Sequence, residues 1–331
     1  MRARPLRPGN VYPVRSTAPW GPERPRRVEW LENEVIWSGT RLATFLRMTT
    51  HHKQPDARTR LDRHREALEL LNSLARPFLL GGGYALRHYT GGVRGTKDLD
   101  VFVRRQDALA LLDGMARAGL ETDLTFPHWL GKVHMTSDDH IDVIFGSGNG
   151  LAEVDDEWFA HSVPATALGV PVNLCPREEM IWSKAFVMER ERYDGADISH
   201  LIRGCQGRLD WRRLLARFGS HWRVLLSHLT LFGFIYPGER ACIPPEVMVG
   251  LCRLLEWESA EPSAGDRLCQ GTLLSREQYL ADVSRWGYAD GRLEPHGQMT
   301  PDEVAQWTAA IDSEKTEAEK VDVDKIDVEQ A

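Results

Sequence analysis

The chain has 331 residues, of which 42% are hydrophobic and 27% charged, so it can form one large domain or two medium ones with a sizeable core. A formal net charge of −7 excludes a global field that would draw the protein onto nucleic acid, although a local basic groove stays compatible with it. The five cysteines are odd in number and lack CxxC spacing, which indicates neither a zinc site nor a disulfide framework, and we expect a reducing, cytoplasmic location.

The two ends of the sequence differ from its middle. Residues 1–47 are rich in Pro and Arg and have no periodicity, which predicts disorder. Two interpretations stay open for them: a basic arm that binds nucleic acid, or an over-extended gene start with Met48 as the natural first residue, which we favour. Residues 313–331 are acidic and free of aromatic residues, and we expect a solvated tail. We expect no secretory leader, because the first residues have no apolar segment.

The first half of the sequence predicts alternating strands and helices. Predicted strands are short apolar runs bounded by turn residues, at 77–80, 98–103, 120–126, 131–137 and 140–146. Predicted helices have apolar residues at helical spacing, at 59–74, from Tyr84 onward and at 106–119. Three glycines join the first strand to the second helix. This alternation indicates an α/β unit.

After about residue 175 the sequence predicts helices. Three segments have helical spacing of apolar residues, at 176–202, 210–236 and 244–259. The most apolar stretch, 224–236, is shorter than the ~20 residues of a membrane span, so we expect a buried core helix there. The tryptophans of this half (Trp182, Trp211, Trp222) are expected in the core rather than on a base-stacking surface.

Two aspartates, Asp98 and Asp100, open the strand at 98–103 and share one face of it, because alternate side chains of a strand point the same way. Two carboxylates about 4 Å apart repel by roughly 4 kcal/mol at an effective dielectric constant of 20. A divalent cation between them relieves this repulsion, and Mg²⁺ typically takes one or two carboxylates plus phosphate oxygens. Asp142, at the start of another apolar strand, would complete a three-carboxylate cluster suited to two metals in phosphoryl transfer.

The glycine run at 81–83 supplies a second feature of a phosphate site. A glycine turn between strand and helix lets backbone N–H groups reach phosphate, and the helix N-terminus adds partial positive charge; Gly81 and Gly82 are placed for this. The run has neither GxGxxG nor GxxxxGK[ST] spacing, which excludes a Rossmann or Walker loop. Followed by two aspartates on the next strand, the turn predicts a nucleotide site.

Together, "LLGGGYAL", "TKDLDVFV" and "HIDVIFG" resemble the nucleotidyltransferase superfamily that includes DNA polymerase β, over residues 77–146. The resemblance implies an α+β fold, a mixed β-sheet flanked by helices, followed here by a mostly α-helical C-terminal domain. It also implies Mg²⁺- or Mn²⁺-dependent transfer of a nucleoside monophosphate from an NTP, such as ATP, to an acceptor hydroxyl with release of pyrophosphate.

The resemblance also implies roles for individual residues. Asp98 and Asp100 would hold the metals together with Asp142, which would also help to activate the acceptor hydroxyl. Gly81 and Gly82 would contact the triphosphate. Many members have Ser at the position of Gly82, whereas the branch with two glycines has Gly there, as this chain does. The backbone must then make the phosphate contact.

Basic residues near these motifs are further candidates. Lys184 lies in a segment similar to the helix that follows the catalytic core in smaller members, and it is the candidate phosphate contact, with Arg190 and Arg192 behind it. Lys97 and Arg94 flank the acidic strand and are candidates for contact with nucleotide or acceptor, with plain surface charge as the alternative.

Lys132 is interpreted in the same two ways, with plain surface charge as the commoner outcome. Three histidines near it (His128, His134, His140) lack metal-ligand spacing, and we expect no zinc role for them. Two of the three fall in predicted strands, where we expect them on opposite faces.

The sequence therefore predicts an extension at 1–55, a nucleotidyltransferase catalytic domain at 56–175, a helical domain at 176–295 and an acidic tail at 296–331. The acceptor stays open. It is a small molecule, as in aminoglycoside and lincosamide nucleotidylyltransferases, or tRNA or a protein in a toxin–antitoxin or phage-defence setting with a cognate antitoxin or toxin as partner. The third interpretation is a catalytically inactive binding module or antitoxin with the same fold, which an intact three-carboxylate set disfavours.

Overall fold

The computed structural model describes residues 57–92, 96–136, 139–261, 265 and 267–311, which all belong to one compact unit, Lys53–Ala331. The predicted extension at 1–55 and residues 312–331 of the predicted acidic tail lie outside the described residues. The beginning of that tail differs from the prediction: it forms a helix at 301–311, and Met299 and Ile311 are buried. All five cysteines are free thiols.

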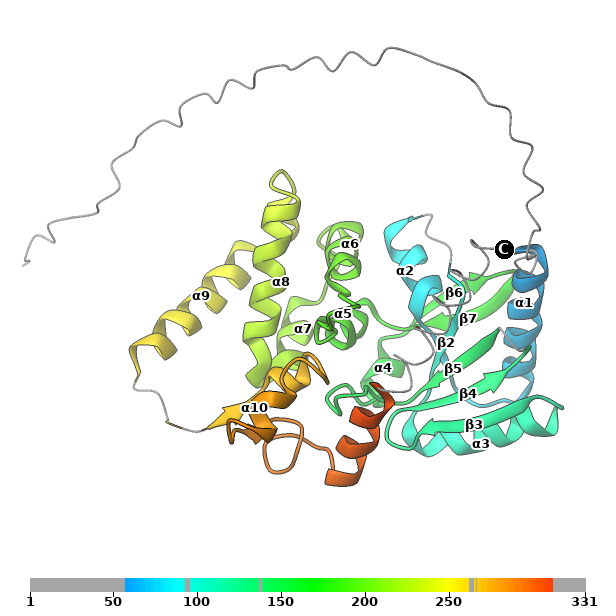
Figure 1. Cartoon of the computed structure of the whole chain (residues 1–331). Helices are drawn as coiled ribbons and strands as arrows, with labels where there is room; N and C mark the ends of the chain where they lie inside the picture. Colours follow the sequence, from blue (N-terminus) through cyan, green and yellow to red (C-terminus); the bar gives the residue numbers. More distant parts are fainter. Residues whose placement is uncertain (1–56, 93–95, 137–138, 262–264, 266, 312–331) are drawn as a thin grey trace, which may run out of the picture. The chain divides into compact units, whose positions relative to one another are not determined.

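A seven-stranded mixed sheet occupies the first half of the chain (Figure 1). Its strands follow one another across the sheet in the order β3 (Glu121–Phe126), β4 (Leu130–His134), β5 (His140–Ile144), β2 (Leu99–Phe102), β1 (Leu79–Leu80), β7 (Val170–Leu174) and β6 (Val163–Ala167). The pairs β2–β5 and β1–β7 are parallel and the other pairs are antiparallel. The predicted α+β class with a mixed sheet is confirmed.

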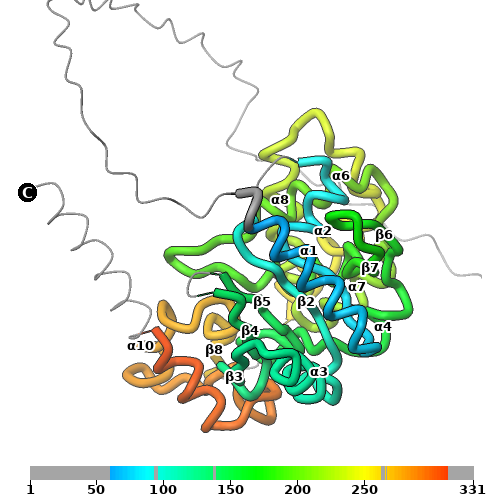
Figure 2. The backbone as a smooth tube through the Cα atoms, turned by 90° about the vertical axis from the view of Figure 1, so that its right-hand side faces the viewer, coloured from blue at the N-terminus to red at the C-terminus, as the bar shows by residue number. Residues whose placement is uncertain are grey.

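The three neighbouring strands β4, β5 and β2 each turn one face of apolar side chains toward the core. Their apolar side chains are fully buried, at 0% exposure: Leu99, Val101, Val133, Ile141 and Val143. This face is covered by α3 (Arg105–Arg117), which approaches so closely that a side chain at Gly131 would meet Leu112. Leu74, just beyond α1 (Ala57–Ser73), contacts α3 at Gly114, and Figure 2 shows α1 lying across the sheet. The opposite face carries Asp100, Asp142 and Lys132, with the apolar side chains of Phe102, Ile144 and Leu130 at one end of it.

Two strands of the structure, β6 and β7, were not predicted from the sequence. They occupy 163–174, just before the predicted start of the helical half, and β7 extends the sheet by pairing Leu174 with Leu80 of β1. Pro164 and Pro171 lie within these strands. Proline is unfavourable for strands because it has no N–H to donate, so the segment has a weak strand signal.

The described residues after 150 are mostly helical. The helices there include α4 (Asp156–Ala160), α5 (Arg177–Ala185), α6 (Gly195–Cys205), α7 (Trp211–Phe218), α8 (Trp222–Ile235), α9 (Pro245–Ala260) and α10 (Leu280–Ser284). A two-stranded sheet joins β8 (Leu268–Cys269) to β9 (Ala289–Asp290). The helix α2 (Gly82–Thr90) of the first half packs against α6 (Figure 1).

Two of the three long helices predicted from sequence are broken, which corrects that prediction. The segment 176–202 divides into α5 and α6, because its middle pairs elsewhere: Met188 N–H donates to the Leu274 carbonyl (3.0 Å). The segment 210–236 divides into α7 and α8 at Gly219, whose φ of 48° is not helical. The third predicted helix corresponds to α9.

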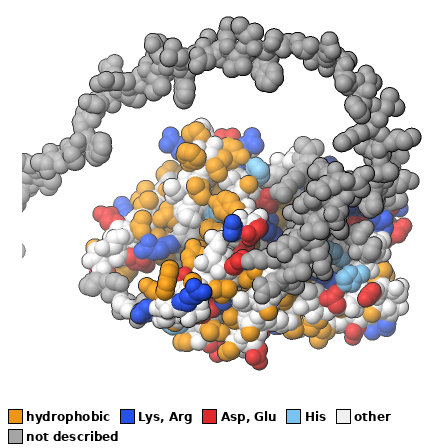
Figure 3. Space-filling model, in the orientation of Figure 1, with side chains coloured by type: hydrophobic (Ala, Val, Ile, Leu, Met, Phe, Trp, Pro, Cys, Tyr) orange, Lys and Arg blue, Asp and Glu red, His pale blue; other side chains and the backbone are white. Residues whose placement is uncertain are grey.

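The apolar helix α8 is only partly buried, contrary to the expectation of a core helix. Its buried side packs on α5, α6 and α7, while Phe234 is 83% exposed on the other side. Figure 3 shows hydrophobic side chains at the surface over α8 and α9. The three tryptophans, in contrast, are buried as predicted. None of the described helices combines the length and apolar character needed to cross a bilayer.

Candidate active site

A row of charged side chains crosses the polar face of the sheet. Asp100 of β2 is the register partner of Asp142 on the parallel strand β5, and Asp142 is the register partner of Lys132 on the antiparallel strand β4. Because neighbouring strands lie about 4.8 Å apart, these three side chains are close neighbours. Asp98, just before β2, lies close enough to Asp100 to raise the pKa of that carboxyl by repulsion. The structure therefore brings the three predicted aspartates together.

Asp100 is the carboxylate with the most unfavourable surroundings. Burial raises its pKa to about 6, and repulsion from Asp142 and Asp98 adds to this, against attraction by Lys184 and Arg192. A carboxylate surrounded in this way is under-compensated at neutral pH and is a favourable site for added positive charge.

The glycine turn is built directly onto Asp100. Gly81 N–H donates to the backbone oxygen of Asp100 (2.9 Å), which ties β1 to β2. Gly82 already belongs to α2, two residues earlier than predicted, and has a φ of 49°. A Cβ at Gly82 would lie 1.6 Å from Asp100 Oδ2, so only glycine fits. The N-terminal turn of α2, whose first N–H groups have no intrahelical acceptor, thus begins at the carboxylate.

Asp142 differs from Asp100 in being paired. Its Oδ1 accepts a hydrogen bond from Lys132 Nζ (3.0 Å) and lies 3.3 Å from His140 Nε2. Burial opposes ionisation, but hydrogen bonds from His140 and Lys132 prevail and hold the pKa of Asp142 below its usual range. Lys132 is therefore part of the carboxylate row rather than a plain surface charge.

The prediction that two histidines alternate between strand faces is wrong. His134 and His140 are register partners on β4 and β5, and their ring centroids lie 6.4 Å apart. The antiparallel register sets this pairing, and a single sequence does not reveal register. Both rings therefore extend the polar face beyond Lys132.

Lys184 approaches the site from the last turn of α5. Its Nζ donates to Asp194 (2.9 Å) and Asp197 (2.8 Å) at the start of α6, and it also attracts Asp100. Burial opposes the charged form, yet attraction by Asp194 and Asp197 keeps the pKa of Lys184 above its usual value. Arg192 Nε lies 3.2 Å from Asp194 Oδ1, and the positive charge of Arg192 also attracts Asp100.

The other basic candidates are less closely tied to the carboxylates than Lys184 and Arg192. Lys97, beside Asp98, is exposed. Arg190 is also exposed, and its Nε lies 3.8 Å from Glu191 Oε1. Arg94 lies outside the described residues.

Substitution of the two candidate lysines is expected to have unequal effects on stability. Lys184→Met should lower the free energy of unfolding by about 3 kcal/mol, because it removes one partner of buried ion pairs with Asp194 and Asp197. Lys97→Met, at an exposed position, should change it by less than about 0.5 kcal/mol. Urea unfolding of both variants measures the difference. Equal stabilities would show that Lys184 is not anchored as described.

The donor chemistry of the site fits a hard divalent cation. Asp98 and Asp100 present carboxylate oxygens, and the pKa of Asp100 is raised first by burial and then by repulsion from Asp142 and Asp98. Within the described part of the chain, no group of three or more His, Cys, Asp or Glu side chains is placed to hold one ion. A complete protein cage is not required for Mg²⁺, which is usually bound by one or two carboxylates and substrate phosphates.

Several contacts of the site were not predictable from the sequence motifs. The bonds from Lys132 and His140 to Asp142 depend on strand register, and those from Lys184 to Asp194 and Asp197 depend on the break between α5 and α6. The only sequence signal for either set was the presence of a basic residue near each acidic one.

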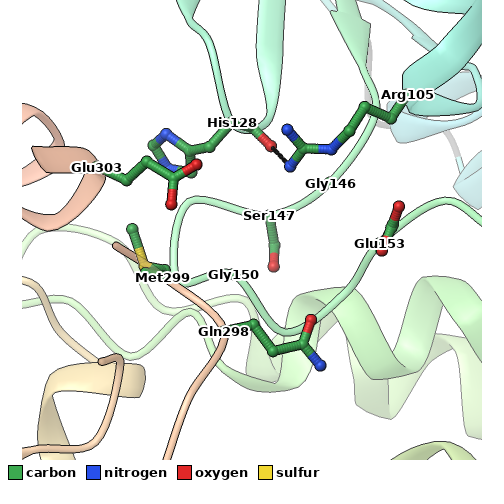
Figure 4. Close-up of a pocket in the computed structure, with 9 residues that line it drawn as sticks. All are labelled: Arg105, His128, Gly146, Ser147, Gly150, Glu153, Gln298, Met299 and Glu303. Carbon is green, nitrogen blue, oxygen red and sulfur yellow. Dashed lines mark hydrogen bonds between the residues drawn. The ribbon is translucent and has the colours of Figure 1, made fainter. Parts of the chain in front are cut away.

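A separate small cavity lies beyond the end of β5 (Figure 4). Arg105 donates to the carbonyl oxygen of His128 at its edge (2.5 Å), and Gln298 and Glu303 reach it from the C-terminal segment. None of the predicted site residues lines it. We assign it no part in the chemistry of the carboxylates.

Comparisons with known proteins give matches among solved structures. A scan against protein-family models and a search of curated proteins find no match. The chain is similar to the antibiotic-resistance factor ANT(2'')-Ia in solution, with 19% identity, a TM-score of 0.38, and coverage of 52% of this chain and 97% of that one. It is also similar to the lincosamide antibiotic adenylyltransferase LnuA with lincomycin bound, with 13% identity, a TM-score of 0.32, and coverage of 42% and 94%.

A third similar structure is an antigenic nucleotidyltransferase-like protein from Paracoccidioides brasiliensis, with 16% identity, a TM-score of 0.33, and coverage of 53% and 93%.

Proposed function

We propose that the protein is a nucleotidyltransferase that moves a nucleoside monophosphate from an NTP to an acceptor hydroxyl. The observation that carries this proposal is the placement of Asp98, Asp100 and Asp142 on one sheet face beside the glycine turn at Gly81 and Gly82. Clustered carboxylates suit the divalent cation of a nucleoside triphosphate, and the helix N-terminus next to them suits its phosphates.

In the proposed reaction the acceptor oxygen attacks the α-phosphorus, a new P–O bond forms, the bond to pyrophosphate breaks, and the proton of the acceptor hydroxyl passes to Asp142. Mg²⁺ or Mn²⁺ held by Asp98 and Asp100 would stabilise charge on the transferring group. The turn at Gly81 and Gly82, with the first N–H groups of α2, would hold the phosphates. Asp142 would accept the hydrogen bond of the acceptor hydroxyl at Oδ2, since Oδ1 is engaged by Lys132 and His140.

Further basic groups would bind the nucleotide from the helical side. Lys184 and Arg192 already act on Asp100 and would attract the phosphates, and Lys97 would do so from the exposed end of β2. We accordingly propose a catalytic domain at 56–175 and a helical domain at 176–295 that contributes Lys184. A cytoplasmic setting suits five free cysteines.

The acceptor is proposed only as a class: a small molecule, or tRNA or a protein in a toxin–antitoxin or defence setting. An inactive binding module is the alternative. The surroundings of Asp100 disfavour it, because a carboxylate whose pKa is raised to about 6 lowers stability at neutral pH without serving a binding role.

Label transfer is the direct test of the proposal. The full chain, incubated with each of four α-³²P-labelled NTPs and Mg²⁺ or Mn²⁺, should transfer label to total RNA, to lysate protein or to a panel of small hydroxyl compounds such as aminoglycosides. Each pool is assayed in a separate tube, so the labelled pool identifies the acceptor class.

The double variant Asp98→Ala/Asp100→Ala is the control and should transfer no label. Label that persists in the double variant would exclude these residues as the catalytic centre. Absence of label in every tube, together with no stabilisation of the protein by any NTP, would exclude the enzyme and favour the binding module.

A further inference from the structure

The third carboxylate of the site already has a fixed cation beside it. Lys132 Nζ lies 3.0 Å from Asp142 Oδ1 and 2.8 Å from His140 Nε2. The side chains of Lys132 and Asp142 are only 25% and 21% exposed, so water screens this pair less than a surface pair. The pairing is dictated by register, since Lys132 and Asp142 are directly opposite each other on antiparallel strands.

This ammonium divides the carboxylate row into two parts of different character. Asp142 is paired with a cation of the chain itself, Lys132, whose Nζ donates to its Oδ1. Asp100 is repelled by Asp98 and Asp142. A second ion bound at Asp142 would have to displace Lys132 or tolerate its positive charge across a single carboxylate. An ion at Asp98 and Asp100 meets a carboxylate, Asp100, whose burial and repulsion are only partly offset by Lys184 and Arg192.

Resting on the proposed function, we propose that Lys132 takes the place of a second metal ion, so that the site binds one divalent cation, at Asp98 and Asp100. Lys132 is then a positioning residue: it holds Asp142 Oδ1 and leaves Oδ2 for the acceptor hydroxyl. The acceptor side of the site would depend on a lysine of β4 instead of on a bound ion.

The number of Mn²⁺ ions per chain tests this proposal without any turnover. Free Mn²⁺ is measured by electron paramagnetic resonance while the full chain is titrated with MnCl₂, in the presence of saturating α,β-methylene-ATP, with a protein-free nucleotide titration subtracted. We expect one ion per chain for the natural protein and for Lys132→Arg. Lys132→Met, which keeps the length of the side chain but removes its charge, should bind two.

Arg117→Met is the matched control, because it removes one positive charge at an exposed position at the end of α3 and should still bind one ion. Circular dichroism and thermal unfolding establish that each variant is folded. If Lys132→Met does not fold, Lys132→Gln replaces it, and the stoichiometry of the natural protein remains a test by itself.

Two ions in the natural protein would overturn the proposal, and so would one ion in both the natural protein and Lys132→Met. A complete lack of Mn²⁺ binding with the nucleotide present would instead contradict the proposed function. The two failures are therefore distinguishable from the same titration.

Discussion

Asp100→Asn is expected to abolish nucleotidyl transfer while making the metal-free protein more stable. Activity should fall by about 10³-fold or more, because a group that stabilises charge in phosphoryl transfer is lost. The gain in stability follows from burial and from repulsion by Asp142 and Asp98, which raise the pKa of Asp100 to about 6. A folded-state pKa near 6 in place of 3.8 corresponds to about 3 kcal/mol at neutral pH, as an upper bound.

The gain should depend on pH with a defined sign. Because the pKa of Asp100 is raised in the folded state, its favourable contribution exists below the unfolded value of 3.8 and is lost as pH rises through about 6. The asparagine variant lacks this loss. The difference in unfolding free energy between variant and natural protein should therefore be near zero at pH 4, grow through pH 6 and be constant above it.

Urea unfolding in EDTA across this pH range measures the difference, and other carboxylates that titrate in both proteins largely cancel. Asp113→Asn, at an exposed position of α3, is the matched control and should show no such growth. Mg²⁺ should stabilise the natural protein more than the variant. A variant that is less stable at pH 8 in EDTA would refute the description of Asp100 as an under-compensated carboxylate.

The rules behind the predicted acidic centre are local, so the sequence alone is enough to state the prediction. Strand alternation predicts that Asp98 and Asp100 share one face, whatever the rest of the fold. The glycine run is likewise read from a few adjacent residues. The partner of Asp142 was not predictable, because register across β4 and β5 decides whether Lys132 or a neighbour lies opposite, and a slip of one residue moves every side chain to the other face.

The ion-pair partners of Lys184 could not be predicted from the sequence for a different reason, the break between α5 and α6. A continuous helix over 176–202 would place Lys184 and Asp194 about 15 Å apart along its axis, at 1.5 Å per residue. The chain instead leaves the helix after Ala185 and starts α6 at Gly195, which brings both Asp194 and Asp197 within hydrogen-bond distance of the lysine. Apolar periodicity continues through the break, and the partner that fixes it, the Leu274 carbonyl, is far away in sequence.

Gly82→Ala is expected to remove nucleotidyl transfer almost as completely as loss of the aspartate does. The new methyl group would lie 1.6 Å from Asp100 Oδ2, so the carboxylate or the N-terminal turn of α2 must move. A displacement of about 1 Å at a reacting centre costs about 10²-fold in rate, and we expect at least that loss. The φ of 49° adds backbone strain of about 1 kcal/mol.

Gly91→Ala is a matched control on the same helix. Gly91 ends α2 with a φ of 67°, but a Cβ there meets nothing within 4 Å. It should therefore show the backbone strain alone, about 1 kcal/mol in urea unfolding, and keep label transfer and NTP-dependent stabilisation. Because both variants add one methyl group at a left-handed glycine of one helix, only the contact with Asp100 separates them. Equal activity in the two would mean that the turn at Gly82 does not position the carboxylate, and the proposed arrangement of phosphate and metal ligands would fail with it.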